Sequence, residues 1–122
     1  MALRNIGNGR KSGLYTPTLT AVTNVAAATA PNRLMYSCEG DVVHVTGIIN
    51  VDPTAAAATT LRISLPFPCD ITAGELAGNG AAVASGHGRI TPDVTNNDAQ
   101  LDYTSAGTAA EDIAVDFSYL AT

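Results

Sequence analysis

Ser85 and His87 stand two positions apart and are the residues that could act as a nucleophile and its general base. An α/β-hydrolase carries its serine in a Gly-x-Ser-x-Gly turn, and here Val83 occupies the position of the first glycine. A triad also needs a carboxylate that orients the histidine, and the spacing of the eleven acidic residues selects none. We therefore predict that His87 is exposed in a glycine-rich segment and that the chain is not an enzyme.

The cysteines could bind zinc or form a disulfide. Cys38 and Cys69 are 31 positions apart, and together with two scattered histidines they lack the paired spacing of zinc ligands. In a reducing cytoplasm such residues are usually buried thiols, and we predict that state for both. A Cys38–Cys69 disulfide is the alternative if their strands are neighbours.

Residues 93–98 gather carboxylate and amide oxygens that could bind calcium. The segment departs from the calcium-loop pattern, because Asp98 stands where glycine is required and Thr104 where the bidentate glutamate is required. We predict a solvated loop whose Asp and Asn side chains form turns, with neither a metal nor another cofactor. A weak calcium site between subunits is the alternative.

Charge is distributed unevenly along the chain. Residues 1–13 hold three of the six basic residues and no acidic one, whereas the remainder holds eleven acidic residues and three basic ones. Three glycines and two asparagines disfavour independent structure in the basic segment. We predict an attachment arm over residues 1–13, followed by one domain over residues 14–122. The residues expected to bind a partner are Leu3, Arg4, Ile6, Arg10 and Lys11.

An acidic domain is a poor match for nucleic acid, whose binding depends on neutralising phosphates. No apolar run approaches the 18 residues of a membrane-spanning helix, and the N-terminus lacks the apolar segment of a signal peptide. We expect a protein made in the cytoplasm, without nucleic-acid, membrane or small-molecule partners.

Apolar residues recur at every second position, which is the period of a β-strand. The clearest case is residues 33–51, where the turn sequence Glu39-Gly40-Asp41 separates two alternating runs and predicts a β-hairpin. In its second strand, Val43 and Val45 share the core face, whereas His44 points out of the sheet or into a subunit contact. Further strands are predicted around residues 15–19, 61–65, 76–85 and 87–90 (these two with bulges or a bend), 101–103 and 113–119.

About eight short strands separated by turns predict an all-β, jelly-roll-like sandwich of two antiparallel sheets, with the arm extended from it. The alanine-rich residues 26–30 are too few for a stable helix. Ala, Thr and Gly make up 47 of the 122 residues, so the core is modest and an isolated domain would be only marginally stable.

Five stretches resemble, in the same order, a β-sandwich module of tailed-phage structural proteins. The module occurs as the end domain of fibres and head fibres and as a small free-standing protein. The matching stretches are residues 13–25, 36–38, 43–53, 63–66 and 116–119 (GLYTPTLTAVTNV, YSC, VHVTGIINVDP, ISLP and DFSY). The resemblance covers about residues 13–120 and rests on strand residues rather than on a reactive motif.

The resemblance implies a homotrimeric virion protein with a jelly-roll-like fold, and it carries over no catalytic residue. Fibre versions have a shaft or a long N-terminal region, whereas this chain has only the basic arm. We therefore expect a capsid decoration (cement) protein on the outer surface of the virion. It would trimerise and pin neighbouring subunits of the major capsid protein through its arm. The alternative is the receptor- or glycan-binding tip of a phage fibre or spike, with residues 54–59 and 91–98 as its binding loops.

Overall fold

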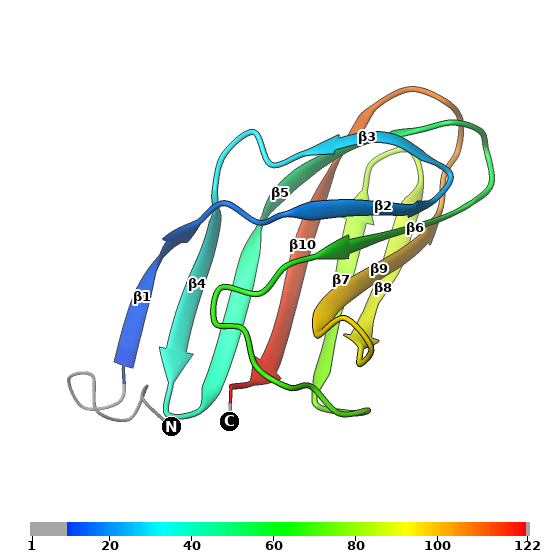
Figure 1. The fold of residues 1–122 in the computed structure, drawn as a ribbon. Coiled ribbons are helices and arrows are strands. Elements are labelled where there is room, and N and C mark those ends of the chain that lie inside the picture. Colours follow the sequence, from blue (N-terminus) through cyan, green and yellow to red (C-terminus); the bar gives the residue numbers. More distant parts are fainter. Residues whose placement is uncertain (1–9, 122) are drawn as a thin grey trace.

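Every element in the computed structural model, which describes residues 10–121, is a β-strand (Figure 1). The predicted all-β class is therefore confirmed, and no helix in this part of the chain could span a membrane. The strands are β1 (Arg10–Tyr15), β2 (Leu19–Thr23), β3 (Val25–Thr29), β4 (Leu34–Glu39), β5 (Val42–Pro53), β6 (Ala58–Ile63), β7 (Leu76–Ala82), β8 (Gly86–Asp93), β9 (Asp98–Thr104) and β10 (Glu111–Leu120).

The strands form one antiparallel hydrogen-bonded path in the order β1-β4-β5-β10-β7-β8-β9-β6-β2, and β3 also pairs with β5. The path folds over at β8, so that β9, β6 and β2 form a layer that crosses β5 and β10 (Figure 1). The sandwich-like form is as predicted, and one curled, hydrogen-bonded sheet supplies both of its layers. The single extended segment expected near Pro17 is two strands, because β1 pairs with β4 and β2 with β6.

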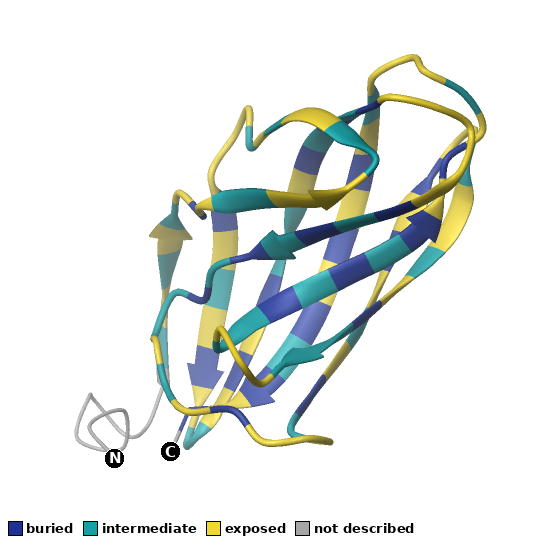
Figure 2. Ribbon diagram, turned by 45° about the vertical axis from the view of Figure 1, so that its right-hand side comes forward, coloured by how far each residue is buried: buried dark blue, intermediate teal, exposed yellow. Residues whose placement is uncertain are grey.

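The predicted β4–β5 hairpin is confirmed. Gly40 makes its turn with a φ of 63°, a conformation that glycine adopts without steric cost. In β5, Val43 and Val45 are fully buried while His44 is exposed, and the same alternation runs along β10 (Figure 2). A strand with one apolar face packs that face against the opposite layer, so this alternation produces the core.

The glycines of β7 allow its backbone to lie close against β10. A Cβ at Gly78 would stand 2.1 Å from the Asp116 carbonyl oxygen and 2.4 Å from the Cβ of Phe117. The pairing of β7 with both neighbours nevertheless continues in register, so the bulges proposed there are absent. Register shifts occur instead in β2 and β3, on either side of Asn24.

The loop after β6 packs over one side of the core through Phe67. The Tyr119 hydroxyl bonds both backbone groups of Phe67, donating to its carbonyl at 3.1 Å and accepting from its N–H at 3.2 Å. Tyr36 packs edge-on against the Phe67 ring, with 5.1 Å between centroids, and the Tyr15 hydroxyl donates to the Ser64 carbonyl at 2.8 Å. These contacts connect the loop to β10, β4 and β1.

Candidate interaction surface

The predicted arm overlaps the sheet. Leu3, Arg4 and Ile6 lie outside the described residues, whereas Arg10 and Lys11 form the start of β1, opposite Glu39 and Cys38 of β4. The Lys11 ammonium lies 5.3 Å from the centroid of the Phe67 ring, which is a cation–π contact. Lys11 therefore contacts the body of its own chain, and residues 10–13 of the predicted arm belong to the sheet.

β1 is the first strand of the sheet path, and β4 is its only strand partner among residues 10–121. The other edge of β1 therefore presents backbone N–H and C=O groups that a strand of another protein could pair with. The segment that we predicted to attach the protein, residues 1–13, runs into this edge strand and supplies its first four residues.

Large apolar side chains stand on the solvent side of the same sheet. We call the solvent-facing side of β1, β4, β5, β10 and β7 the outer face. Strand register places Leu14 beside Met35 and Val42 beside Leu120 on this face, with Ile48 beside Ala114. Five of the eight exposed large apolar side chains among the described residues lie here: Leu14, Met35, Val42, Ile48 and Leu120.

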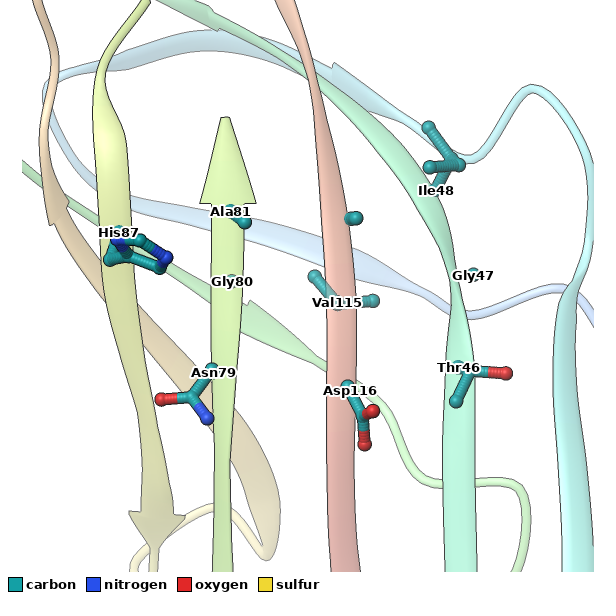
Figure 3. Close-up of a pocket in the computed structure, with 10 residues that line it drawn as sticks. Thr46, Gly47, Ile48, Asn79, Gly80, Ala81, His87, Val115 and Asp116 are labelled. Atoms are coloured by element: carbon teal, nitrogen blue, oxygen red, sulfur yellow. The ribbon is translucent and has the colours of Figure 1, made fainter. Parts of the chain in front are cut away.

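The outer face is hollowed where its strands carry small residues. The hollow has a volume of about 650 Å³ and lies over β5, β10 and β7. Ala81 and Ala114 are among the residues that line it. Ile48 and His87 stand on opposite sides of it (Figure 3). We call this cavity the hollow; its other lining residues are Thr46, Gly47, Asn79, Gly80, Val115 and Asp116.

Two carboxylates of the outer face have partners within the chain. The Asp116 Oδ1 lies 2.5 Å from the Nε2 of His44, and the Asn50 amide donates to Asp112 at 3.0 Å. His44 thus points out of the sheet, as predicted. A carboxylate that already has a partner costs less to cover than a lone one, so these pairs are compatible with a protein contact on this face.

Ser85, one of the two residues considered for nucleophilic chemistry, bonds residues other than His87. The Ser85 hydroxyl donates to the Glu111 carboxylate and accepts from the backbone N–H of Ala106. His87 lies on β8 beside the hollow and is exposed, as predicted. Ser85 therefore connects the β7–β8 turn to the start of β10.

Residues 93–98 form the turn that we predicted. The Asp93 Oδ1 accepts from the backbone N–H groups of Thr95 and Asn96, each at 3.2 Å, and the Asn96 side chain donates to Oδ2 at 2.8 Å. The bond from the Asn96 side chain is the main cause of the lowered pKa of Asp93. Burial raises the pKa of Asp98, although the Arg62 Nε lies 3.9 Å from its carboxylate. Among the described residues, no group of three or more His, Cys, Asp and Glu side chains could hold a metal ion.

No disulfide joins Cys38 and Cys69. Cys38 is buried as predicted, and burial raises the pKa of its thiol. Cys69 is only half-buried, contrary to our expectation, and its Sγ lies 3.5 Å from the Leu120 carbonyl. Cys69 follows Pro68 in the loop after β6, so its side chain is less enclosed than one on the core face of a strand.

No protein-family model, curated protein or solved structure matches the chain significantly. The phage-module resemblance drawn from the sequence therefore stays a prediction.

The apolar outer face was not predicted, although the sequence contains a pattern that indicates it. Val42 and Ile48 stand out of phase with the core residues of β5, as Leu120 does in β10. Apolar residues at the solvent-facing phase of two paired strands mark an exposed apolar patch.

Proposed function

We propose that this protein is a capsid decoration protein of a virus particle. It forms a homotrimer and attaches to neighbouring subunits of the major capsid protein through its N-terminal arm. The observation that supports this role best is the position of the arm, whose residues 10–13 form the start of edge strand β1. An arm at this position can reach an adjacent subunit while the sandwich rests on the shell.

Residue chemistry supports the same role. The segment before β1 contains the basic Arg4 and the apolar Leu3 and Ile6, whereas the body is acidic. Leu3 and Ile6 supply apolar anchors, and Arg4 pairs with carboxylates of the capsid. An acidic body is repelled by the packaged nucleic acid, and its charge keeps the decorated particle soluble.

Because a trimer carries three arms, weak contacts between each arm and the capsid are sufficient for attachment. Once one arm of a trimer is bound, the other two bind at a high effective concentration, so modest individual affinities combine into stable attachment. Trimer formation also buries apolar surface, which adds roughly 25 cal/mol per Å² to a fold with a modest core.

Co-sedimentation with undecorated capsid shells tests the role of the arm. The truncation should remove residues 1–9 and keep Arg10, because β1 begins there. We expect the full-length protein to sediment with the shells and the truncated protein, still folded, to stay in solution. Full binding by the truncated form would disprove attachment through the arm.

A charge comparison refines this test. Arg4→Ala should weaken binding, and Arg89→Ala, which removes the same charge from an exposed position on β8, should not. Higher salt should weaken the binding of the unmodified chain if charge contributes. Equal binding by both variants would show that Arg4 makes no contact with the shell.

The fibre-tip alternative has one supporting observation. A second, polar cavity of about 390 Å³ lies between the loop after β6 and the β8–β9 turn. This turn is one of the two loops expected to bind a glycan. Asp70, Asn96 and Asn97 line it and offer the hydrogen-bonding groups that sugars use. Adsorption of the isolated protein to host cells, lost in Asn96→Ala, would favour this alternative over decoration.

A further inference from the structure

We propose that a third cavity, between β6, β8 and β9, binds an acidic sugar, that is, a saccharide residue that carries a carboxylate. The cavity has a volume of about 370 Å³, and its polar lining includes Thr60, His87, Arg89, Asp102 and Thr104. We call it the Arg89 cavity. The inference goes beyond the proposed attachment to a capsid, because the cavity makes no use of the N-terminal arm.

Strand pairing builds the Arg89 cavity on the solvent-facing side of its three strands. The register places Thr60, Asp102 and Arg89 side by side across β6, β9 and β8. Cross-strand neighbours project from the same face of a sheet, so these three side chains form one polar row. In the next row Ala58 stands opposite Thr104, and its small side chain leaves space beside the polar row.

The guanidinium of Arg89 is available to a ligand. It is exposed, and among the described residues no carboxylate lies within 4 Å of it. Arg62, one row away on the same face, is by contrast paired with Asp93 at 3.7 Å and Asp98 at 3.9 Å. A guanidinium presents a planar fork of N–H donors that matches a carboxylate. Arg89 can therefore bind a carboxylate from solution without first breaking an ion pair.

The neighbouring carboxylate of Asp102 determines what else the ligand must carry. Its Oδ1 accepts from the Thr60 hydroxyl at 2.6 Å, and its Oδ2 accepts from the Gln100 amide at 3.0 Å. A carboxylate has about four acceptor positions, so each oxygen can accept one more hydrogen bond. Asp102 thus favours a ligand with hydroxyl donors and disfavours a ligand with a second negative charge.

An acidic sugar meets both requirements. Its single carboxylate pairs with Arg89, and its hydroxyls donate to Asp102. Thr104 supplies a further hydroxyl, and the imidazole of His87 lies on the same face of β8 as Arg89 because two positions separate them. A neutral sugar lacks a partner for the guanidinium, and inorganic phosphate carries more charge beside Asp102. The volume of the cavity lies within the range of small-ligand sites.

The Arg89 cavity is remote from the segment proposed to attach the protein. β1 is the first strand of the sheet path, and β1 and β8 lie on opposite sides of the molecule (Figure 1). The cavity is also separate from the one beside the β8–β9 turn, because it lies at the other end of these two strands. A protein attached through its arm can therefore still present the Arg89 cavity to a sugar.

Titration of the ¹⁵N-labelled protein with D-glucuronate, followed by amide chemical shifts, tests the site. We expect saturable shifts at residues of β6, β8 and β9 around the cavity. D-glucose lacks the carboxylate and propionate lacks the hydroxyls, so each should bind at least about fivefold more weakly. Absence of saturable shifts with glucuronate would overturn the proposal. Inorganic phosphate that binds as tightly as glucuronate would overturn the assignment to an acidic sugar.

Charge variants test the role of Arg89. Arg89→Ala should weaken glucuronate binding at least about fivefold, and Arg89→Lys, which keeps the charge and loses the planar fork, should also weaken it. The control is Arg33→Ala, which removes the same charge from an exposed position between β3 and β4 and should bind normally. Circular dichroism verifies that each variant is folded. A folded Arg89→Ala variant that binds as tightly as the unmodified chain would overturn the proposal.

A steric variant and the arm truncation complete the test. Ala58→Leu should obstruct the cavity and weaken binding, whereas Ala73→Leu, at an exposed loop position, should have no effect. The protein without residues 1–9 should bind glucuronate as the full chain does, and loss of binding on truncation would place the sugar on the arm and overturn the site. Shell binding is measured separately, so the failure of either proposal leaves the other standing.

Discussion

The amide nitrogen of Asn24 lies 2.8 Å from the hydroxyl of Thr59 and 2.8 Å from the carbonyl oxygen of Ala55. It also bonds Ser105 at 3.3 Å, and Thr59 and Ser105 are the buried polar residues of the described chain. Asn24 thus joins the β2–β3 junction to two loops at one end of the sandwich. It does so with a φ of 60°, a left-handed conformation that Asn tolerates better than most residues.

Substitutions at Asn24 separate the side-chain bonds from the backbone conformation. Asn24→Gly keeps the positive φ and loses the bonds, and we expect a loss of about 1–3 kcal/mol in the free energy of unfolding. Asn24→Ala loses the bonds and also strains the backbone, so it should cost about 1–2 kcal/mol more. Urea unfolding measures both values. Equal losses in the two variants would show that the backbone conformation contributes nothing.

Removal of two buried tyrosine hydroxyls should have different effects on the free energy of unfolding. Tyr119→Phe loses both bonds to Phe67, and the free energy of unfolding should fall by about 1–3 kcal/mol. The Tyr103 hydroxyl is buried without a hydrogen-bond partner among the described residues, so Tyr103→Phe should be neutral or stabilising. Thermal unfolding compares them. A Tyr103→Phe variant as unstable as Tyr119→Phe would mean that the Tyr103 hydroxyl has a partner.

Close approach of the backbones makes Gly78 intolerant of a side chain. In Gly78→Ala the new Cβ would overlap the Asp116 carbonyl, so β7 has to move away from β10. We expect a loss of at least about 3 kcal/mol, at the upper end for overpacked sites. Gly107→Ala is the matched control, since nothing lies within 4 Å of its Cβ, and its effect should stay within about 0.5 kcal/mol. Urea unfolding that finds equal effects would contradict the close β7–β10 packing.

Alkaline pH should destabilise the fold. Burial raises the pKa of Tyr103 to about 12, and the nearby charge of Glu111 adds to the shift. Burial also raises the pKa values of Tyr15 and Tyr119. Because these folded-state values lie above the unfolded value of about 10, their contribution is complete below pH 10 and is lost as the pH rises toward 12.

The urea midpoint measured from pH 8 to pH 12 checks this expectation. It should fall above pH 10, and Tyr103→Phe should make the fall less steep, because one titrating group has been removed. A midpoint that is constant to pH 12 would contradict the burial of these hydroxyls.

Period-two alternation was sufficient to predict the β4–β5 hairpin and the core of β10, because each has one apolar face. It could not reveal that residues 10–13 belong to the sheet. Lys11 and Gly13 carry no apolar pattern, and β1 is specified by pairing with β4, which is distant in the sequence. The hollow was equally hidden, because it arises from small residues on three strands that only the folded sheet brings together.

Titration of the full-length protein against purified, undecorated capsid shells tests the proposed function most directly. The bound protein, quantified after sedimentation, should saturate at a fixed ratio to the major capsid protein, with the trimer as the binding unit. The protein without residues 1–9 should remain unbound at the same concentrations. Absence of binding by the folded, full-length trimer would contradict a decoration role and favour a fibre tip.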